Sequence, residues 1–282
     1  KKIKVLRIMH RINVGGPTYH AAYLTKHLDK GVFKSMLISG NIDNSEKSGK
    51  YILDSLNVEV KYIKNMYRKI NLFKDFIALI EIINIINKFK PTIVHTHAAK
   101  SGTLGRLAAI ICRTPVILHT FHGNVFHSYF NKYKTLFFKY VERFLANFST
   151  SIIAISEKQK DDLIDNKICS IEKVQVINLG FDLKKFIVDK KNKRHQFRKE
   201  FNIKEDEIAI GIVGRLDPIK NHSLFLDAIK YLKENSKNKI RAFIIGDGIE
   251  LQNLLNHCKN IELNYNDVND SELSNTVCFC SW

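Results

Sequence analysis

The chain has 282 residues, which is enough for two domains, and its 45% hydrophobic and 26% charged residues are typical of a soluble globular protein. The net charge of +17 permits binding to nucleic acid, to phosphate-rich substrates or to an anionic membrane. A nucleic-acid partner is not expected, because the sequence has neither a dense basic block nor a nucleic-acid-binding motif. The five cysteines form no C-x-x-C pair, which argues against a zinc or disulfide framework and fits a reducing, cytoplasmic compartment.

Apolar runs alternate with helical patterns along the first two thirds of the chain. The predicted strands are Lys4–Met9, Phe33–Ser39, Val58–Ile63, Thr92–Thr96, Val116–Thr120, Ser151–Ile155 and Val174–Ile177. The predicted helices are Thr18–Leu28, Leu72–Phe89, Ser101–Cys112, Asn131–Phe148 and one that begins at the capping box of Ser156 and Gln159. The longest apolar stretch, Phe76 to Ile86, is too short to span a membrane and predicts a mostly buried helix. Strands that alternate with helices predict an α/β fold with a parallel, doubly wound sheet.

A polar segment then separates two α/β regions. Residues 184–207 are rich in Lys, Asp and Asn, and we interpret them as the interdomain connection. Residues 1–183 form the first Rossmann-like domain in this interpretation, and residues 208–282 begin the second. The strands expected there are a buried parallel strand at Ile208–Val213, followed by Ala242–Ile245 and Thr276–Cys280. Cys278 and Cys280 are expected on one face of the last strand.

The stretch Gly211–Asn221 predicts a phosphate site. A helix is expected from about Lys220, with one apolar stripe formed by Leu224, Phe225, Ala228, Ile229 and Leu232. Arg215 and Lys220 would then flank the crevice at the carboxyl end of a parallel strand, where open α/β sheets bind ligands. Two cations beside a helix N-terminus favour an anion. The alternative is a strand-to-helix loop with solvated cations.

Two glycine pairs lie in strand-to-helix turns. Gly15 and Gly16 follow the first strand and would let the backbone approach a ligand closely. Gly246 and Gly248 follow a strand of the second domain. Neither pair completes G-x-G-x-x-G, which argues against a dinucleotide dehydrogenase.

Histidines gather at the ends of the fourth and fifth predicted strands. His95, His97, His119 and His122 could meet there as a metal site, but no regular ligand spacing supports one. His95 and His119 are otherwise expected to be core or loop histidines with backbone partners. His122 precedes Gly123 in an open loop, Phe121 to Ser128, where it could hydrogen-bond a sugar or polarise a reacting group.

Further cations lie on the two helices that follow. Lys100, near a helix N-terminus, is a candidate phosphate ligand, whereas Arg106 is expected to be structural. Between Phe126 and Phe148, aromatic residues alternate with Lys132, Lys134, Lys139 and Arg143. Such a helix either lies on an anionic membrane surface or packs on the sheet as an ordinary amphipathic helix.

In their order and spacing these motifs resemble those of retaining glycosyltransferases of the GT-B fold, family 4. The resemblance rests on Gly15-Gly16, His95-Thr-His97-Ala-Ala-Lys100, Gly105-Arg106-Leu-Ala-Ala109, His119-Thr-Phe-His-Gly123, Ile155-Ser156, Asn178-Leu-Gly-Phe-Asp182, Gly214-Arg215, Lys220-Asn221 and Gly246-Asp-Gly248. It implies an acceptor-side first domain and a second domain that binds the nucleotide sugar. It also implies that Arg215 and Lys220 bind the donor diphosphate, that Gly15-Gly16 approaches donor and acceptor, and that His122 lines the reaction centre. Such enzymes need no metal or other cofactor.

The resemblance predicts transfer of a sugar from a UDP- or GDP-sugar to a glycan or polyprenyl-linked acceptor, in bacterial surface polysaccharide synthesis. The protein would be cytoplasmic or peripheral on the inner face of the cell membrane. The chain departs from the family in one respect: no position matches its paired-glutamate motif, for which Glu250 and Glu272 lie too early. We therefore expect a C-terminally truncated second domain and an inactive fragment. The alternatives are a GT-B sugar-nucleotide epimerase and a catalytically silent nucleotide- or glycan-binding fragment.

Overall fold

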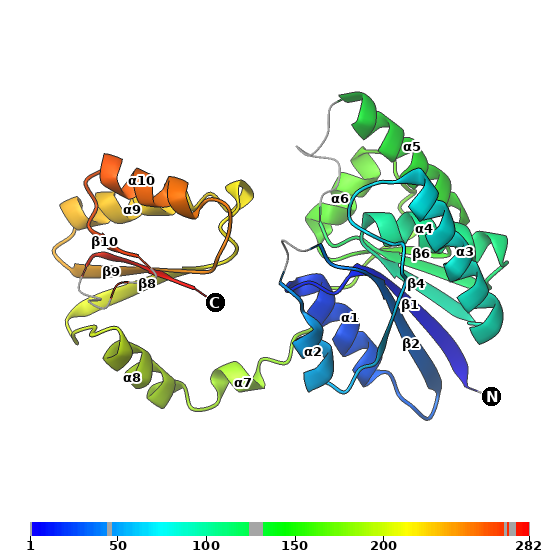
Figure 1. Cartoon of the computed structure of the whole chain (residues 1–282), viewed down its shortest axis with the longest axis horizontal. Coiled ribbons are helices and arrows are strands. Elements are labelled where there is room, and N and C mark those ends of the chain that lie inside the picture. Colours follow the sequence, from blue (N-terminus) through cyan, green and yellow to red (C-terminus); the bar gives the residue numbers. More distant parts are fainter. Residues whose placement is uncertain (1, 44–46, 124–131, 268–269, 271–274, 282) are drawn as a thin grey trace. The chain divides into compact units, whose positions relative to one another are not determined.

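The computed structural model describes residues 2–43, 47–123, 132–267, 270 and 275–281, with the side chain of Lys185 left out. The chain divides into two compact units, Lys1–Asp182 and Leu183–Trp282, and each is described by itself. The helices and strands of both are labelled in Figure 1. Among the described residues, no helix has the length and apolar character needed to cross a bilayer.

The first unit is built on a seven-stranded sheet whose order is β3-β2-β1-β4-β5-β6-β7. All its strand pairs are parallel. The strands are β1 (Ile3–Arg11), β2 (Phe33–Gly40), β3 (Val60–Tyr62), β4 (Ile93–His97), β5 (Val116–Thr120), β6 (Ser151–Ala154) and β7 (Val174–Val176). Because the order reverses at β1, the sheet is doubly wound, as the sequence predicts.

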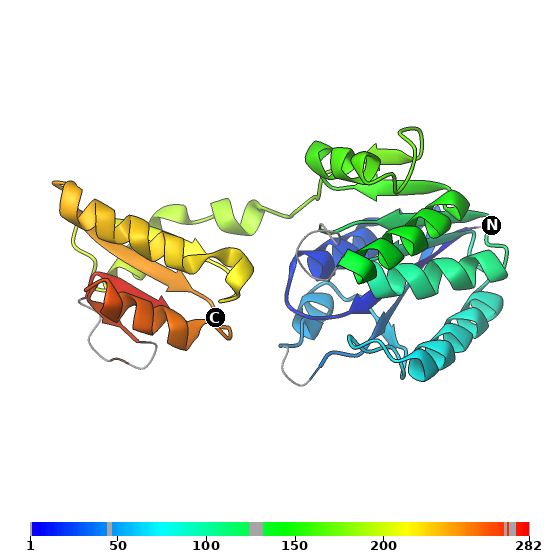
Figure 2. The same ribbon diagram turned by 90° about the horizontal axis from the view of Figure 1, so that it is seen from above.

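Helices cover both faces of this sheet. They are α1 (Gly16–His27), α2 (Lys50–Ser55), α3 (Leu72–Phe89), α4 (Ala99–Ile111), α5 (Lys132–Phe148) and α6 (Glu157–Asp165). In Figures 1 and 2, α3, α4 and α5 lie side by side along one face, while α1 and α2 lie on the other. The largest apolar core lies under α3 and α4 and includes Ile8, Ile82 and Val94, while a second core lies under α1 and α2. The short helix α2 is absent from the sequence prediction.

Helix α3 has the bounds that its sequence pattern predicts. Asn71 caps its start, because the Asn71 side chain accepts a hydrogen bond from the Lys74 backbone N–H, and Lys90 ends it in a left-handed conformation. The prediction of a mostly buried helix at Phe76–Ile86 is wrong at Phe76 and Ile80, which are 60% and 43% exposed. One side of the helix, with Ala78, Ile82 and Ile86, is buried. The N-cap at Ser156 is confirmed, because the Ser156 side chain accepts from the Gln159 backbone N–H. The reciprocal bond of a capping box is shifted by one residue, since the Gln159 side chain accepts from the Ile155 N–H.

The second unit carries a four-stranded parallel sheet of order β10-β11-β9-β8. Its strands are β8 (Glu207–Val213), β9 (Lys239–Ile245), β10 (Tyr265–Asn266) and β11 (Val277–Cys280). Its helical segments are α7 (Lys184–Ile187), α8 (Lys190–Glu200), the 3-10 turn η1 (Pro218–Lys220), α9 (His222–Asn235) and α10 (Leu251–Asn260). The described cysteines are free, and Cys278 and Cys280 share β11, as predicted.

Two expectations for the second unit are wrong. Strand β8 lies at the edge of the sheet rather than in its interior, and it leaves Ile208 45% and Val213 67% exposed. The apolar stripe of α9 also differs: the helix begins at His222, two residues after the expected start, because η1 and a left-handed Asn221 come first. Its buried residues are therefore His222, Leu226 and Ile229, and Leu224 of the predicted stripe is 62% exposed.

Helix α8 lies in the segment that we interpret as the interdomain connection. The rings of Phe197 and Phe201 pack on Phe243 of β9, with ring centroids 5.1 and 5.2 Å away. Ile203 and Cys278 complete this small apolar cluster. The helix therefore covers one face of the second sheet, and residues 197–203 take part in the fold of that unit.

Candidate functional site

The first candidate site lies where β1, β4 and β5 end, because the carboxyl ends of parallel strands share one edge of the sheet. Gly15 precedes α1 as its N-cap residue and Gly16 is the first residue of that helix. A Cβ added to Gly16 would meet nothing within 4 Å, and one added to Gly15 would make only ordinary contact with Pro17. Packing therefore does not require glycine at either position.

Three histidine side chains meet beside this turn. His97 ends β4, His122 follows β5, and His20 comes from the second turn of α1. Nδ1 of His97 lies 2.9 Å from Nε2 of His122, so one ring donates a hydrogen bond to the other. His20 stands edge-on to both rings, with centroid distances of 5.7 Å to His97 and 5.3 Å to His122.

Burial keeps these rings neutral near pH 7. It lowers the pKa of His20 to about 4, with a further contribution from the charge of Arg7. Burial also lowers the pKa of His122 to about 4, with a smaller contribution from His20, and lowers that of His97 well below its usual range. Neutral imidazole offers one donor and one acceptor nitrogen, which suits hydrogen bonding to hydroxyl groups.

His95 and His119 have other partners. Nε2 of His95 lies 2.8 Å from Oγ1 of Thr120, and Nδ1 of His119 lies 2.8 Å from Oγ1 of Thr96. Both side chains are buried, as expected of core histidines. Their partners are threonine hydroxyls instead of the expected backbone groups.

Sequence reasoning missed Arg7, which lies under α1 near this histidine group. Its side chain is buried, and its Nη1 donates to Oγ1 of Thr25 at 2.7 Å and to Oγ of Ser35 at 3.4 Å. Desolvation by burial lowers its pKa to about 10, so it still carries a charge at neutral pH. The sequence did carry a signal for it, because Arg7 is a charged residue within the apolar run that predicts the strand Lys4–Met9.

The ammonium group of Lys100 is held by neighbouring residues. Its Nζ donates to the carbonyls of Tyr67 and Lys69 at 2.7 and 2.6 Å and forms an ion pair with Asp75 at 2.6 Å. Lys100 thus ties the loop before α3 to the first turn of α4. Arg106 is structural, as predicted: it is buried in an ion pair with Glu142 of α5.

In the second unit, Arg215 and Lys220 occupy the loop after β8. The Arg215 guanidinium is exposed and pairs with Asp217 at 3.0 Å. Lys220 is also exposed, and a Cβ added to Gly214 would lie 4.0 Å from Cγ and Cδ of Lys220. The Lys220 stem therefore runs beside the end of β8.

The loop after β9 supports the Arg215 loop. The Leu216 backbone N–H donates to the carbonyl of Asp247, and the Glu250 N–H donates to the carbonyl of Leu216, both at 3.0 Å. A Cβ on Gly248 would lie 2.3 Å from the Leu216 carbonyl oxygen, so only glycine fits there. Beyond β11, Oγ of Ser281 donates to the Asp247 carboxylate. Three strand ends thus form one polar edge that carries two exposed cations.

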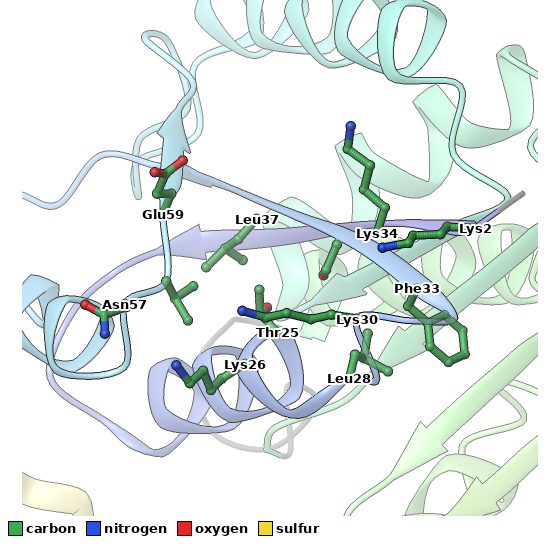
Figure 3. A pocket seen from close by; sticks show the side chains of 12 residues that line it. Lys2, Thr25, Lys26, Leu28, Lys30, Phe33, Lys34, Leu37, Asn57 and Glu59 are labelled. Atoms are coloured by element: carbon green, nitrogen blue, oxygen red, sulfur yellow. The ribbon is translucent and has the colours of Figure 1, made fainter.

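A separate pocket of about 520 Å³ lies at the amino edge of the first sheet, between the end of α1 and the start of β2. Figure 3 shows Lys2, Lys26, Lys30 and Lys34 around it, together with Glu59. The amino ends of the strands lie opposite the candidate site, and we assign this pocket no part in it.

Two family models match the chain. Residues 14–185 match the model of Glycosyltransferase Family 4, and residues 193–267 match that of Glycosyl transferases group 1. The first match alone covers more than half of the 282 residues.

The chain belongs to glycosyltransferase family 4.

Named relatives of this family 4 chain are longer proteins. It is 35% identical over 233 residues to the Escherichia coli UDP-Gal:alpha-D-GlcNAc-diphosphoundecaprenol alpha-1,3-galactosyltransferase, a match that covers 82% of this chain and 57% of the relative. It is 28% identical over 213 residues to the capsular polysaccharide biosynthesis glycosyltransferase CapM of Staphylococcus aureus, a match that covers 74% of this chain and 54% of that relative. The family 4 chain therefore spans little more than half the length of these curated relatives.

Among solved structures, the family 4 chain is similar to Anabaena Alr3699/HepE in complex with UDP-glucose. The TM-score is 0.73 at 16% identity, and the match covers 99% of this chain and 69% of the other. At this identity the likeness concerns the fold alone. It confirms the prediction of a GT-B type fold built from Rossmann-like parallel sheets.

Proposed function

We propose that the protein transfers a sugar from a nucleotide-diphosphate donor, a UDP- or GDP-sugar, to a glycan or polyprenyl-linked acceptor in bacterial surface polysaccharide synthesis. Membership of family 4 supports this proposal, as do the activities named for the Escherichia coli and Staphylococcus aureus relatives. The observation that carries it is the polar edge of the second unit. There Arg215 and Lys220 stand exposed at the end of β8, braced by the glycine loop after β9.

The proposed roles follow from this placement. Arg215 and Lys220 bind the diphosphate and offset the charge that develops on it as the sugar leaves. The turn at Gly15 and Gly16 approaches the substrates, since packing leaves room there. His122, which is neutral at pH 7, hydrogen-bonds the transferred sugar or polarises a reacting group.

Two further proposals concern Lys100 and the stereochemistry of transfer. Lys100, the second residue of α4, binds a substrate phosphate when it exchanges its contact with Asp75 for one with the ligand. Retention of the anomeric configuration is proposed on family membership alone. The configuration of the new linkage, determined by NMR of the product, tests it.

A donor panel tests the proposed activity. The protein is incubated with UDP- and GDP-sugars and a polyprenyl-diphosphate-linked sugar, and the products are identified by mass spectrometry. We expect one donor to extend the acceptor by one sugar in a protein of the curated relatives' full length, and residues 1–282 alone, in which no position matches the paired-glutamate motif, to give no product. An epimerised donor, or nucleotide binding without any product, would instead favour one of the two alternatives. A preparation with His122→Phe separates enzymatic transfer from contaminating activity.

Removal of a donor-site cation should weaken nucleotide binding. A charged hydrogen bond contributes roughly 1.5–3 kcal/mol, so we expect Lys220→Ala and Arg215→Ala each to raise the Kd for UDP or GDP by about one to two orders of magnitude. Calorimetry measures the effect. Lys230→Ala is the matched control, because Lys230 lies on α9 and pairs with Glu234. Wild-type nucleotide affinity in both variants would contradict the placement of the diphosphate site in this loop.

We further propose that α5 contacts an anionic membrane surface. Its exposed side chains include large aromatics and cations: Tyr133, Phe137, Tyr140, Phe144, Lys132 and Lys134. Its single acid, Glu142, is buried against Arg106. A groove of about 330 Å³ between α4 and α5 is lined by Thr103, Leu107, Tyr140, Val141, Phe144 and Leu145. Exposed aromatics with cations and no exposed acid are typical of helices that lie in the membrane interface.

Charge reversal on α5 should release the protein from anionic vesicles. We expect Lys132→Glu, Lys134→Glu and Lys139→Glu together to reduce co-sedimentation with phosphatidylglycerol vesicles, and added salt to weaken wild-type binding by screening. The matched control reverses Lys26, Lys30 and Lys34, which line the pocket at the amino edge of the first sheet, where no residue of α5 takes part. Equal sedimentation of the wild type and the α5 variant would favour the alternative, in which α5 packs on the sheet and does not contact the membrane.

A further inference from the structure

Three imidazole rings from separate elements face one another in the first unit. One ring nitrogen each from His20, His97 and His122 lies within 4.8 Å of the other two. We propose that these three residues form a binding site for a divalent transition-metal ion, of which Zn²⁺ is the representative.

The spacing of the rings fits a tetrahedral three-histidine site. With a Zn–N distance of about 2.05 Å, the centre of a ligating imidazole lies about 3.2 Å from the ion, and tetrahedral angles then place two such centres about 5.2 Å apart. The centroid distances are 5.2 Å for His97 and His122, 5.3 Å for His20 and His122, and 5.7 Å for His20 and His97. All three lie within about half an ångström of that value, and the rings of His97 and His122, whose facing nitrogens point at each other, would have to turn to bind one ion.

The hydrogen bonding of the three rings is incomplete. Nδ1 of His97 and Nε2 of His122 face each other at 2.9 Å, whereas Nδ1 of His20 is buried and has no partner among the described residues. A metal ion held by these two facing nitrogens and by one nitrogen of His20 would replace the single hydrogen bond between His97 and His122 and would engage all three rings at once.

The donor set selects the kind of ion. Three neutral imidazoles suit Zn²⁺, Cu²⁺, Ni²⁺ or Co²⁺, whereas Mg²⁺ and Ca²⁺ require oxygen ligands. Among the described residues, no carboxylate or thiolate belongs to the group. The Arg7 charge acts on His20 and His97 and would also repel a cation. We therefore expect weaker binding than at structural zinc sites, and a fourth position left for water.

Metal binding would have a consequence for the proposed transfer reaction, and this part of the inference rests on that proposed function. An ion on His122 would occupy a ring nitrogen that the sugar is proposed to use. Zn²⁺ would then act as an inhibitor and not as a cofactor, in keeping with a family expected to need no metal.

Cobalt spectroscopy tests the site without reference to activity. Titration of metal-free protein with Co²⁺ should give the visible d–d bands of a tetrahedral complex, at a stoichiometry of one, and Zn²⁺ should displace it. We expect His20→Gln and His97→Gln each to weaken metal binding by at least ~100-fold, since the loss of groups that only support a ligand already costs about 10–100-fold. His195→Gln is the matched control, because His195 is exposed on α8 in the other unit.

A fold measurement and a second variant distinguish loss of a metal ligand from misfolding. Circular dichroism establishes that each variant is folded, and His20→Cys, which replaces one ligand by another, should keep the metal and add a thiolate-to-cobalt band in the near ultraviolet. An octahedral spectrum, unchanged affinity in His20→Gln and His97→Gln, or no thiolate band in His20→Cys would overturn the metal site.

Failure of the metal site and failure of the proposed sugar transfer give different experimental results. Absence of tetrahedral Co²⁺ binding refutes the metal site and leaves the proposed transfer untouched. Tetrahedral binding in a protein that transfers no sugar from any donor refutes the proposed function alone. Transfer that persists with Zn²⁺ bound at one equivalent refutes the inhibitory role.

Discussion

Replacing Glu142 with alanine should destabilise the first unit by about 3–5 kcal/mol, because a buried arginine would lose its counter-charge. Arg106 is fully buried on α4. Its Nε donates to the Gly102 carbonyl at 2.9 Å, and its Nη2 contacts the Glu142 carboxylate of α5 at 2.5 Å. Chemical unfolding monitored by circular dichroism measures the change in the free energy of unfolding.

Two further variants make this prediction specific. Arg106→Met combined with Glu142→Leu removes both charges and keeps apolar volume, so most of the lost stability should return. Asp206→Ala breaks an exposed ion pair with Lys239 and should have no measurable effect. If Glu142→Ala unfolds like the wild type, the two side chains do not form a buried pair.

Replacing Gly248 with alanine should disturb both the stability of the second unit and its nucleotide binding. The added Cβ would lie 2.3 Å from the Leu216 carbonyl oxygen and 2.7 Å from the Leu216 nitrogen, and neither is the end of a flexible side chain. The Leu216 backbone must therefore shift, at a cost of typically about 1–3 kcal/mol. Since Arg215 precedes Leu216, we also expect UDP affinity to fall by about tenfold or more in the variant that remains folded.

Gly211→Ala is the matched control for this prediction. Gly211 lies on β8 in the same sheet, and a Cβ there would make only ordinary contact with the Phe243 carbonyl oxygen, at 3.8 Å. Its melting temperature and UDP affinity should stay near those of the wild type. If Gly248→Ala behaves in the same way, the two loops do not support each other as the structure describes.

The sequence predicts the parallel sheet of the first unit well, because strands buried on both faces appear as continuous apolar runs and strong helices have a period of 3.6. The bounds of α3 illustrate this. Burial is less well predicted, because the position of a strand in its sheet depends on pairing that the sequence does not display. The run Ile208–Val213 has the composition of an interior strand, yet β8 pairs only with β9 in the described structure.

The candidate site is predicted in part for a related reason. His97 and His122 stand next to strand ends, where topology alone brings them to one edge. His20 lies on α1 outside the stripe of Thr18, Ala21 and Ala22, so helical periodicity gives no reason to expect it inside, and yet it is buried. Lys100 illustrates the opposite case: proximity to a helix N-terminus indicates a ligand contact, whereas Asp75 and two carbonyls already surround its ammonium group.

Strand β4 has a practical consequence for protein engineering. Val94 contributes to the apolar core under α3 and α4, whereas His97 takes part in the histidine group beside α1. Neighbouring side chains of a strand point to opposite faces, so mutational tolerance should differ between the two sides of one sheet. A library that repacks the α3 and α4 side can be selected for heat resistance while the histidine group of the candidate site is left unchanged.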